Sequence, residues 1–268
     1  MKIWAVANQK GGVGKTTTAV SLAGVMQKRG YQVLLVDLDP HGSLTSYFGA
    51  DPDDVESSAY ELFQQTIAVT RAVHKTRFDG LSFIPASSAL ATLDRQLGSR
   101  DGMGLVIKKA LEQLSSQYDY AILDCPPMLG LLMVNALAAC QRLMIPVQTE
   151  FLALKGLERM VHTLSMIQKA RKQQLNYTIV PTFFDRRLKV SIQTLRHLRE
   201  NFSEQIWEKV IPVDNQFREA SQQGIPLSIA RPGCRGSRAY SDLLDYMLAL
   251  DEAALDQPAS EQISERQL

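Results

Sequence analysis

Near its start the chain joins a short apolar run to a helix-forming run through a glycine-rich loop, and few folds accept that combination. The apolar run spans residues 2–8, the loop reads NQKGGVGKTTT, and a helix is predicted over 15–29. Glycines let backbone N–H groups curl round an anion, and the N-terminus of the following helix adds partial positive charge. The stretch therefore predicts a phosphate-binding loop between a strand and a helix.

The same alternation of strand and helix continues along the chain. Short runs rich in Val, Ile and Leu predict strands buried on both faces, with helical stretches between them. The expected strands are 2–8, 32–38, 81–86, 120–126, 142–148, 177–184 and 206–213, and the expected helices are 15–29, 57–65, 88–97, 102–116, 130–140, 153–174, 187–201, 214–222 and 236–250. This order predicts a single α/β domain, with a mostly parallel twisted sheet flanked by helices on both faces.

Length and composition agree with one large domain. The 268 residues suit a P-loop-sized α/β domain at 1–250, followed by an acidic and polar tail at 251–268 that we expect to be disordered. No apolar run approaches the roughly 18 residues that span a bilayer, and the first residues lack the apolar core of a signal peptide. We therefore expect a cytoplasmic protein without membrane insertion. The three cysteines are widely spaced and predict no metal cluster.

Three aspartates follow predicted strands, where ligands of parallel sheets bind. Asp37 and Asp39 stand two residues apart at the end of one strand, so both carboxylates can face the phosphate loop. Asp124 ends another apolar run, on a strand expected to neighbour the strand that leads into the phosphate loop. Such carboxylates predict a Mg²⁺ site, in which one supports the water shell of the ion and another orients an attacking water. The alternative for Asp37 and Asp39 is a turn cap before Pro40.

The glycine loop departs from the ordinary P-loop pattern, which has a glycine five residues before Gly14, where this chain has Gln9. Four segments in order resemble the deviant Walker A ATPases of the ParA/MinD group: KGGVGKTT at 10–17, VDLDPHGSLTSYFG at 36–49, DYAILDCPP at 119–127 and PVQTEFLALKGL at 146–157. The resemblance extends over most of residues 1–250. It implies a P-loop fold and a slow, partner-stimulated, Mg²⁺-dependent hydrolysis of ATP to ADP and phosphate.

The resemblance also implies a role for each residue of the loop. Lys10 would be the signature lysine, which crosses a homodimer interface to the phosphates of the ATP bound by the other subunit. Lys15 would bind the β- and γ-phosphates of its own ATP, and Thr16 would ligate Mg²⁺. The ATP-binding set in the loop is Lys10, Gly11, Gly12, Val13, Gly14, Lys15, Thr16 and Thr17. The alternative for Lys10 is a solvated loop lysine.

The remaining implied roles fall on the segments after later strands. Asp39 would position the attacking water, Asp124 would hold the metal through water, and Asp37 would support its water shell. In this family the segments that follow the last two predicted strands hold the adenine. The residues carried over as base contacts are Thr182 and Pro212, with Phe183 and Asp214 as further candidates. The alternatives are that Phe183 is a core residue and that Asp214 caps the following helix.

One interpretation of the wider role is a positioning ATPase. The opening MKIWAVANQKGGVGKTTT, together with DLDPHGSLTSYFG, resembles the ParA-like ATPases of bacterial chemotaxis gene clusters, the ParC branch. That resemblance implies a switch that dimerises on binding ATP and that places and segregates chemosensory arrays at cell poles. Its partner would be a cargo or adaptor protein of the array.

A second interpretation is a ParA-type partition ATPase that uses nonspecific DNA and a ParB-like stimulator. Residues 151–240 hold 15 Lys and Arg against 7 Asp and Glu, which predicts either a phosphate-binding surface or a solvated face partly offset by the acidic end of the chain. The basic residues singled out are Arg171, Lys172, Arg186, Arg187, Lys189, Arg196, Arg199, Arg218, Arg231, Arg235 and Arg238. Partition members commonly show IPRNVRLSEA, and Val213 and Gln216 stand where its arginines would fall, a form closer to the MinD and flagellar-number branch.

A third interpretation is a membrane-bound or metabolic relative. MinD-like proteins end in a basic amphipathic helix, whereas this chain ends in an acidic segment that anionic lipid would repel. Nitrogenase-type iron proteins need paired cluster cysteines, and Cys125 and Cys140 are not in the places that family uses. The PVQTEFLALKGL segment favours the positioning branch over small-molecule ligases of related fold.

Overall fold

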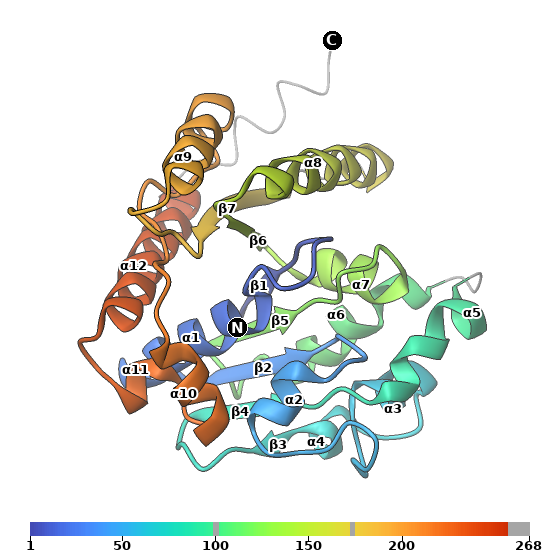
Figure 1. Ribbon diagram of the computed structural model, residues 1–268. Helices are drawn as coiled ribbons and strands as arrows, with labels where there is room; N and C mark the ends of the chain where they lie inside the picture. The colour runs from blue at the N-terminus through green and yellow to red at the C-terminus, as the bar shows by residue number, and fades with distance from the viewer. Residues whose placement is uncertain (99–101, 172–174, 257–268) are drawn as a thin grey trace.

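The computed structural model describes residues 1–98, 102–171 and 175–256. Its centre is a seven-stranded sheet with the order β3-β4-β2-β5-β1-β6-β7 (Figure 1). The strands are β1 (Lys2–Val6), β2 (Val33–Asp37), β3 (His74–Lys75), β4 (Leu81–Ile84), β5 (Tyr120–Asp124), β6 (Arg142–Gln148) and β7 (Asn176–Thr182). Neighbouring strands are parallel except at β3, which pairs antiparallel with β4. The predicted mostly parallel sheet is confirmed.

Helices cover both faces of this sheet, as the sequence predicts. They are α1 (Lys15–Lys28), α2 (Ser43–Tyr47), α3 (Ala59–Gln64), α4 (Val69–Ala72), α5 (Leu93–Leu97), α6 (Val106–Glu112), α7 (Leu131–Ala139), α8 (Phe151–Arg171), α9 (Lys189–Asn201), α10 (Gln216–Gln223), α11 (Leu227–Ala230) and α12 (Arg235–Asp256), with 3₁₀ turns at Ser88–Thr92 and Met103–Leu105. One face packs against α1 and α12, and the other against α3 and α5 to α8. The short elements α2, α4, α11 and β3 are not predicted, because segments of two to five residues show no periodicity.

Two apolar cores lie on the two faces of the sheet. Successive residues of β1 alternate between them, so that Ile3 and Ala5 pack into one core, and Trp4 and Val6 into the other. Burial on both sides explains why the central strands are continuous apolar runs in the sequence. Within the described ranges, no helix has both the length and the apolar character needed to cross a bilayer.

The segment 206–213, predicted to be a strand, is not one. It meets β7 and the residues after it through two isolated bridges, Ile179 with Ile206 and Phe184 with Pro212. Between those bridges the chain bends instead of forming a ladder. Prolines explain the difference, because neither Pro181 in β7 nor Pro212 has an N–H to donate to a ladder at this sheet edge.

The last helix extends past the expected domain boundary at residue 250. Helix α12 continues to Asp256, and Asp251 within it is only 8% exposed. The Asp251 carboxylate pairs with Arg142 and Lys2 and accepts a hydrogen bond from Trp4 Nε1 at 3.3 Å. These partners are distant in sequence, so composition alone assigns 251–256 to the tail, whereas packing places it in the domain. The rest of the predicted tail, 257–268, lies outside the described residues.

Candidate nucleotide-binding site

The glycine loop connects β1 to α1 at the carboxyl edge of the sheet. Gly14 precedes the helix with a φ of 93°, in the left-handed region that glycine adopts without steric cost. Within the described chain no side chain caps α1, and its first turn contains no acidic residue. The first N–H groups of the helix are therefore available, and together with the helix dipole they favour an anion here.

The two lysines of the loop have different surroundings. Lys15 is 8% exposed, and its ammonium donates to the backbone carbonyl of Lys10 at 3.4 Å. Lys10 is more exposed and forms an ion pair with Glu150, the residue that precedes α8. The Lys10 amide donates to Asn8 Oδ1 at 2.9 Å, which holds the loop in shape. One cation is thus enclosed by the loop, and the other is paired at its outer side.

Two buried carboxylates stand side by side next to the loop. Asp37 and Asp124 end β2 and β5 and are partners in the register of these strands, and β5 also neighbours β1 as predicted. Burial raises the pKa of Asp37 to about 6. Burial and the nearby charge of Asp37 raise the pKa of Asp124 well above its usual range. Both carboxylates therefore lack a compensating positive charge of sufficient strength.

The atoms around Asp124 fit a magnesium ion held partly through water. The Thr16 hydroxyl donates to Asp124 Oδ2 at 2.6 Å, while Oδ1 is buried and has no hydrogen-bond partner in the described part of the chain. Such orphaned buried oxygens are rare in folded proteins, and a metal-bound water would satisfy this one. No group of three or more His, Cys, Asp or Glu that could hold an ion gathers in the described ranges.

The other two aspartate positions differ in what they can do. Asp37 Oδ2 accepts hydrogen bonds from the amide and hydroxyl of Thr45 at 2.8 and 2.7 Å, and Oδ1 accepts from the Asp39 amide at 3.1 Å. Asp37 therefore fixes the turn after β2 and has less capacity for a metal-bound water than Asp124. Asp39 is partly exposed and accepts from the amide and the ring of His41 at 3.1 and 2.9 Å. Its carboxylate is the more accessible of the two.

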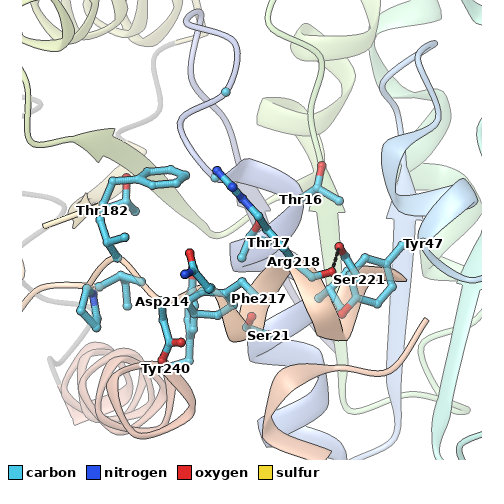
Figure 2. A pocket seen from close by; sticks show the side chains of 18 of the residues that line it. Thr16, Thr17, Ser21, Tyr47, Thr182, Asp214, Phe217, Arg218, Ser221 and Tyr240 are labelled. Atoms are coloured by element: carbon cyan, nitrogen blue, oxygen red, sulfur yellow. Dashed lines mark hydrogen bonds between the residues drawn. The ribbon is translucent and has the colours of Figure 1, made fainter. Parts of the chain in front are cut away.

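A pocket of about 500 Å³ opens beside the start of α1 (Figure 2). Its lining residues come from the loop, α1, α2, the end of β7, the segment 211–218, α10 and α12. They are Gly12, Gly14, Thr16, Thr17, Val20, Ser21, Ser43, Tyr47, Thr182, Phe183, Ile211, Pro212, Val213, Asp214, Asn215, Phe217, Arg218, Ser221 and Tyr240. All four predicted base contacts therefore line the same pocket as four residues of the phosphate loop. Lys10, Gly11, Val13 and Lys15 lie in the loop but outside this lining.

Two of the predicted base contacts are held against the loop itself. The Thr182 hydroxyl is buried and donates to the Val13 carbonyl at 2.9 Å, which ties the end of β7 to the glycine loop. Phe183 has a φ of 52°, a strained value for a residue with a side chain, and its ring lies against Gly14. With 40% of its surface exposed, Phe183 is a pocket residue and not a core residue.

Asp214 lines the pocket but is already occupied by backbone groups. Its Oδ1 accepts from the Gln216 amide at 3.0 Å, and its Oδ2 accepts from the Gly236 amide at 3.2 Å. These amides belong to the first turns of α10 and α12. Asp214 therefore joins the starts of two helices. It caps the helix that follows it, which is the alternative role given above, and it also caps α12.

Sequence reasoning missed several residues that line the pocket. The largest are Tyr47 on α2, Phe217 and Arg218 on α10, and Tyr240 on α12. Helix α10 is predicted, at 214–222, but periodicity does not say which neighbour its apolar face meets. The sequence signal for this contact is Phe217, the one aromatic residue of α10. Its ring packs edge-on against Tyr240, with centroids 5.7 Å apart.

The sheet order, the glycine loop before α1 and the adjoining pocket define a P-loop nucleotide-binding protein. A family model described as the AAA domain matches residues 1–177. The sporulation initiation inhibitor protein Soj of Bacillus subtilis is 38% identical over 249 residues, which are 92% of this chain and 98% of Soj. The chromosome partitioning protein ParA of Myxococcus xanthus is 34% identical over 240 residues, 89% of this chain and 85% of that protein.

A solved structure agrees in fold over nearly the whole chain. The cobyrinic acid a,c-diamide synthase of Mycobacterium smegmatis, with bound ADP and magnesium, has a TM-score of 0.81 and 31% identity, and the match covers 96% of this chain and 98% of that one. The chain belongs to the AAA domain family and, within it, to the ParA/MinD group of P-loop ATPases. The expected family and fold are thereby confirmed.

Proposed function

We propose that this protein is a switch that dimerises on binding ATP, hydrolyses the ATP and so positions a large assembly in the cell. The observation that carries the proposal is the contrast between the two loop lysines. Lys15 is enclosed and suits a nucleotide in its own subunit, whereas Lys10 reaches outward to Glu150. An ion pair this exposed contributes about 1 kcal/mol or less, so Lys10 can exchange Glu150 for a phosphate of a second subunit at small cost.

The site residues would divide the chemistry among them. Thr16 would hold Mg²⁺ directly and Asp124 through water, with Asp37 fixing the adjoining turn. The bound ion would neutralise charge on the phosphates. Asp39, whose carboxylate is partly exposed, would orient the attacking water. A cation delivered by the second subunit would raise the rate by about 10³–10⁵, which makes hydrolysis depend on dimerisation.

The assembly that we propose as cargo is the chemosensory array. The support is the resemblance of the glycine loop and of the segment after Asp37 to ATPases of chemotaxis gene clusters. In this proposal an array protein binds the ATP-bound dimer and stimulates hydrolysis, and the protein is enriched at cell poles.

A partition ATPase is the second candidate, and the similarity to Soj and ParA favours it. Three arginines, Arg186, Arg187 and Arg235, line a hollow of about 460 Å³ that could receive DNA phosphates. Of these three, Arg187 is already paired with Asp185, which also lines the hollow. Further cations of the basic block pair with acids in Arg196–Glu200, Arg199–Glu208 and Lys209–Asp242. Lys172 lies outside the described residues. DNA binding through the remaining charges would fall steeply with salt.

Replacing Asp39 tests the switch. Asp39→Ala is expected to retain ATP, lose hydrolysis and accumulate as a dimer, because the water is no longer oriented. Sedimentation with ATP measures the dimer, and phosphate release measures turnover. The matched control is His41→Ala, which removes the neighbour of the Asp39 carboxylate but leaves the carboxylate itself. An Asp39→Ala protein that binds ATP and stays monomeric would contradict the proposal.

Imaging decides between the two cargoes. A fluorescent fusion is followed in cells together with an array marker and a nucleoid marker, before and after deletion of the native gene. The array proposal expects arrays to leave the poles on deletion, whereas the partition candidate expects unevenly divided DNA. Arrays that remain polar in the deletion strain would rule out the first cargo.

A further inference from the structure

Arg218 on α10 lines the pocket but has no part in the chemistry described above. Building on the proposed nucleotide site, we propose that Arg218 binds the phosphate groups of the nucleotide nearest the nucleoside. It would be a second cation from the same chain, after Lys15, and it would act at the opposite end of the phosphate chain from Lys10.

Helix α10 holds Arg218 in a defined place. At its start, Asp214 Oδ1 accepts from the Gln216 amide at 3.0 Å, and at its end the Arg77 guanidinium donates to the Gln223 carbonyl at 2.6 Å. The Phe217 ring packs on Tyr240 of α12, which fixes the rotation of the helix about its axis. The Arg218 backbone is therefore positioned by contacts at both ends of α10 and by the Phe217 ring on one side.

The side chain of Arg218 points into the pocket. Figure 2 shows it extending from α10 across to Thr17, in front of the start of α1. The hydrogen bonds of Arg218 to described residues involve its backbone, so the five N–H donors of its guanidinium have no partner among them. Its backbone carbonyl, by contrast, accepts from the Ser221 hydroxyl at 2.8 Å. The donors are thus turned toward the space that a nucleotide would fill.

The charges around this space are mostly positive and therefore favour the binding of an anion. Lys15 and the uncapped start of α1 are positive, and the first turn of α1 contains no acid to offset them. Among the described lining residues the acid is Asp214, and both of its oxygens already accept from backbone amides. An arginine without a partner in a pocket that opens at the positive start of α1 is unfavourable until a phosphate arrives, and the planar guanidinium can then bind it with two parallel hydrogen bonds.

The neighbours of the guanidinium indicate which phosphates it meets. Thr16 turns its hydroxyl to Asp124, on the metal side of the loop. Thr17 is the next residue and lines the pocket together with Arg218 (Figure 2). A phosphate bound on the Thr17 side would lie between Lys15 and the part of the pocket that we propose for the base. It would therefore be one of the phosphates nearest the nucleoside, which ATP and ADP both contain. Arg218 should therefore strengthen the binding of both nucleotides and not discriminate between them.

The test compares ligands with and without those phosphates. Displacement of a fluorescent ADP analogue by ATP, ADP and adenosine is measured on the full chain for the native protein, Arg218→Gln and Arg218→Lys. For Arg218→Gln we expect ATP and ADP to bind at least about tenfold more weakly, with adenosine unchanged. Arg218→Lys should recover part of the loss, because lysine keeps the charge but not the planar fork. Arg231→Gln, an exposed arginine outside the pocket, is the matched control.

Each other outcome has a distinct meaning. Unchanged binding of ADP and ATP by Arg218→Gln overturns the inference, and so does a loss restricted to ATP, which would point to the terminal phosphate. An equal loss for adenosine overturns it in favour of stacking on the base. If the native protein and Arg231→Gln bind neither nucleotide, the proposed function fails and not the assignment of Arg218 alone.

Discussion

The two ends of the nucleotide pocket are built in different ways. The phosphate end consists of consecutive residues between β1 and α1, backed by the ends of β2 and β5. The base end collects side chains from β7, the segment 211–218, α10 and α12, which are far apart in the sequence (Figure 2). The register of the sheet determines where the residues of the phosphate end lie, whereas tertiary contacts determine where the residues of the base end lie. Single charges should therefore matter most at the phosphate end, and packing should matter most at the base end.

Close packing against α1 is what holds the base end in place. Gly24 faces α11, and a Cβ there would lie only 2.4 Å from Pro226 Cβ. The Tyr47 hydroxyl donates to the Ile225 carbonyl at 2.9 Å and so ties α2 to the same stretch. A base end assembled from such contacts should tolerate the loss of one of them better than the phosphate end tolerates the loss of a charge.

Removing Lys15 should give the largest effect. Lys15→Ala takes away the enclosed cation, and we expect binding of ATP and ADP to weaken by about two orders of magnitude, because truncating a buried charged partner costs roughly 2–5 kcal/mol. Titration calorimetry measures both nucleotides. Lys28→Ala, at the other end of α1, is the control. If Lys15→Ala and Lys28→Ala bound ATP and ADP with equal affinity, single charges would not matter more at the phosphate end than at the base end.

Removing the ring of Phe183 should give an intermediate effect. Phe183→Ala removes the aromatic ring that we propose contacts the base, and we expect nucleotide affinity to fall several-fold, since such contacts contribute about 1 kcal/mol. Inorganic pyrophosphate has no base, so its ability to compete with the nucleotide for binding should not change. Phe183→Gly should lose the same affinity yet be more stable than Phe183→Ala by about 1 kcal/mol, because glycine relieves the left-handed backbone. Identical melting temperatures for the two variants would speak against strain.

Removing one hydroxyl at the base end should give the smallest effect. The buried Tyr240 hydroxyl and the Thr18 hydroxyl are 2.9 Å apart and join α12 to α1. Tyr240→Phe should lower the free energy of unfolding by about 1 kcal/mol, the usual contribution of one such bond. Nucleotide affinity should stay within a factor of two. Denaturant unfolding measures the first quantity, and a tenfold loss of affinity would show that packing alone does not define this end.

The phosphate end could be predicted because its information is local. The apolar run, the glycines and the helix that follows are contiguous, and the carboxyl ends of parallel strands meet at one edge, which brings Asp37 beside Asp124. The orphaned Asp124 Oδ1 could not be predicted, since it depends on the burial of a single atom.

At the base end the sequence predicts four of the residues that line the pocket, but not their backbone conformation or their hydrogen-bond partners. The left-handed backbone of Phe183 has no sequence signal, and the two amides bound by Asp214 are 2 and 22 positions away. The apolar character of 206–213 predicts a strand, although Pro212 within it argues against an internal ladder. Residues 251–256 were placed in the tail because the Asp251 partner Arg142 lies 109 positions earlier.

Helix α12 is anchored near both of its ends by carboxylates. Asp214 accepts from its second residue, Gly236, and Asp251 near its other end pairs with Arg142 inside the protein. Helices ordinarily fray, so their terminal amides exchange with solvent long before their centres do. In α12 the residues from Gly236 to Asp251 should instead exchange their hydrogens together, at the rate of one cooperative opening. The helix would then report on the opening of the whole face of the sheet that it covers.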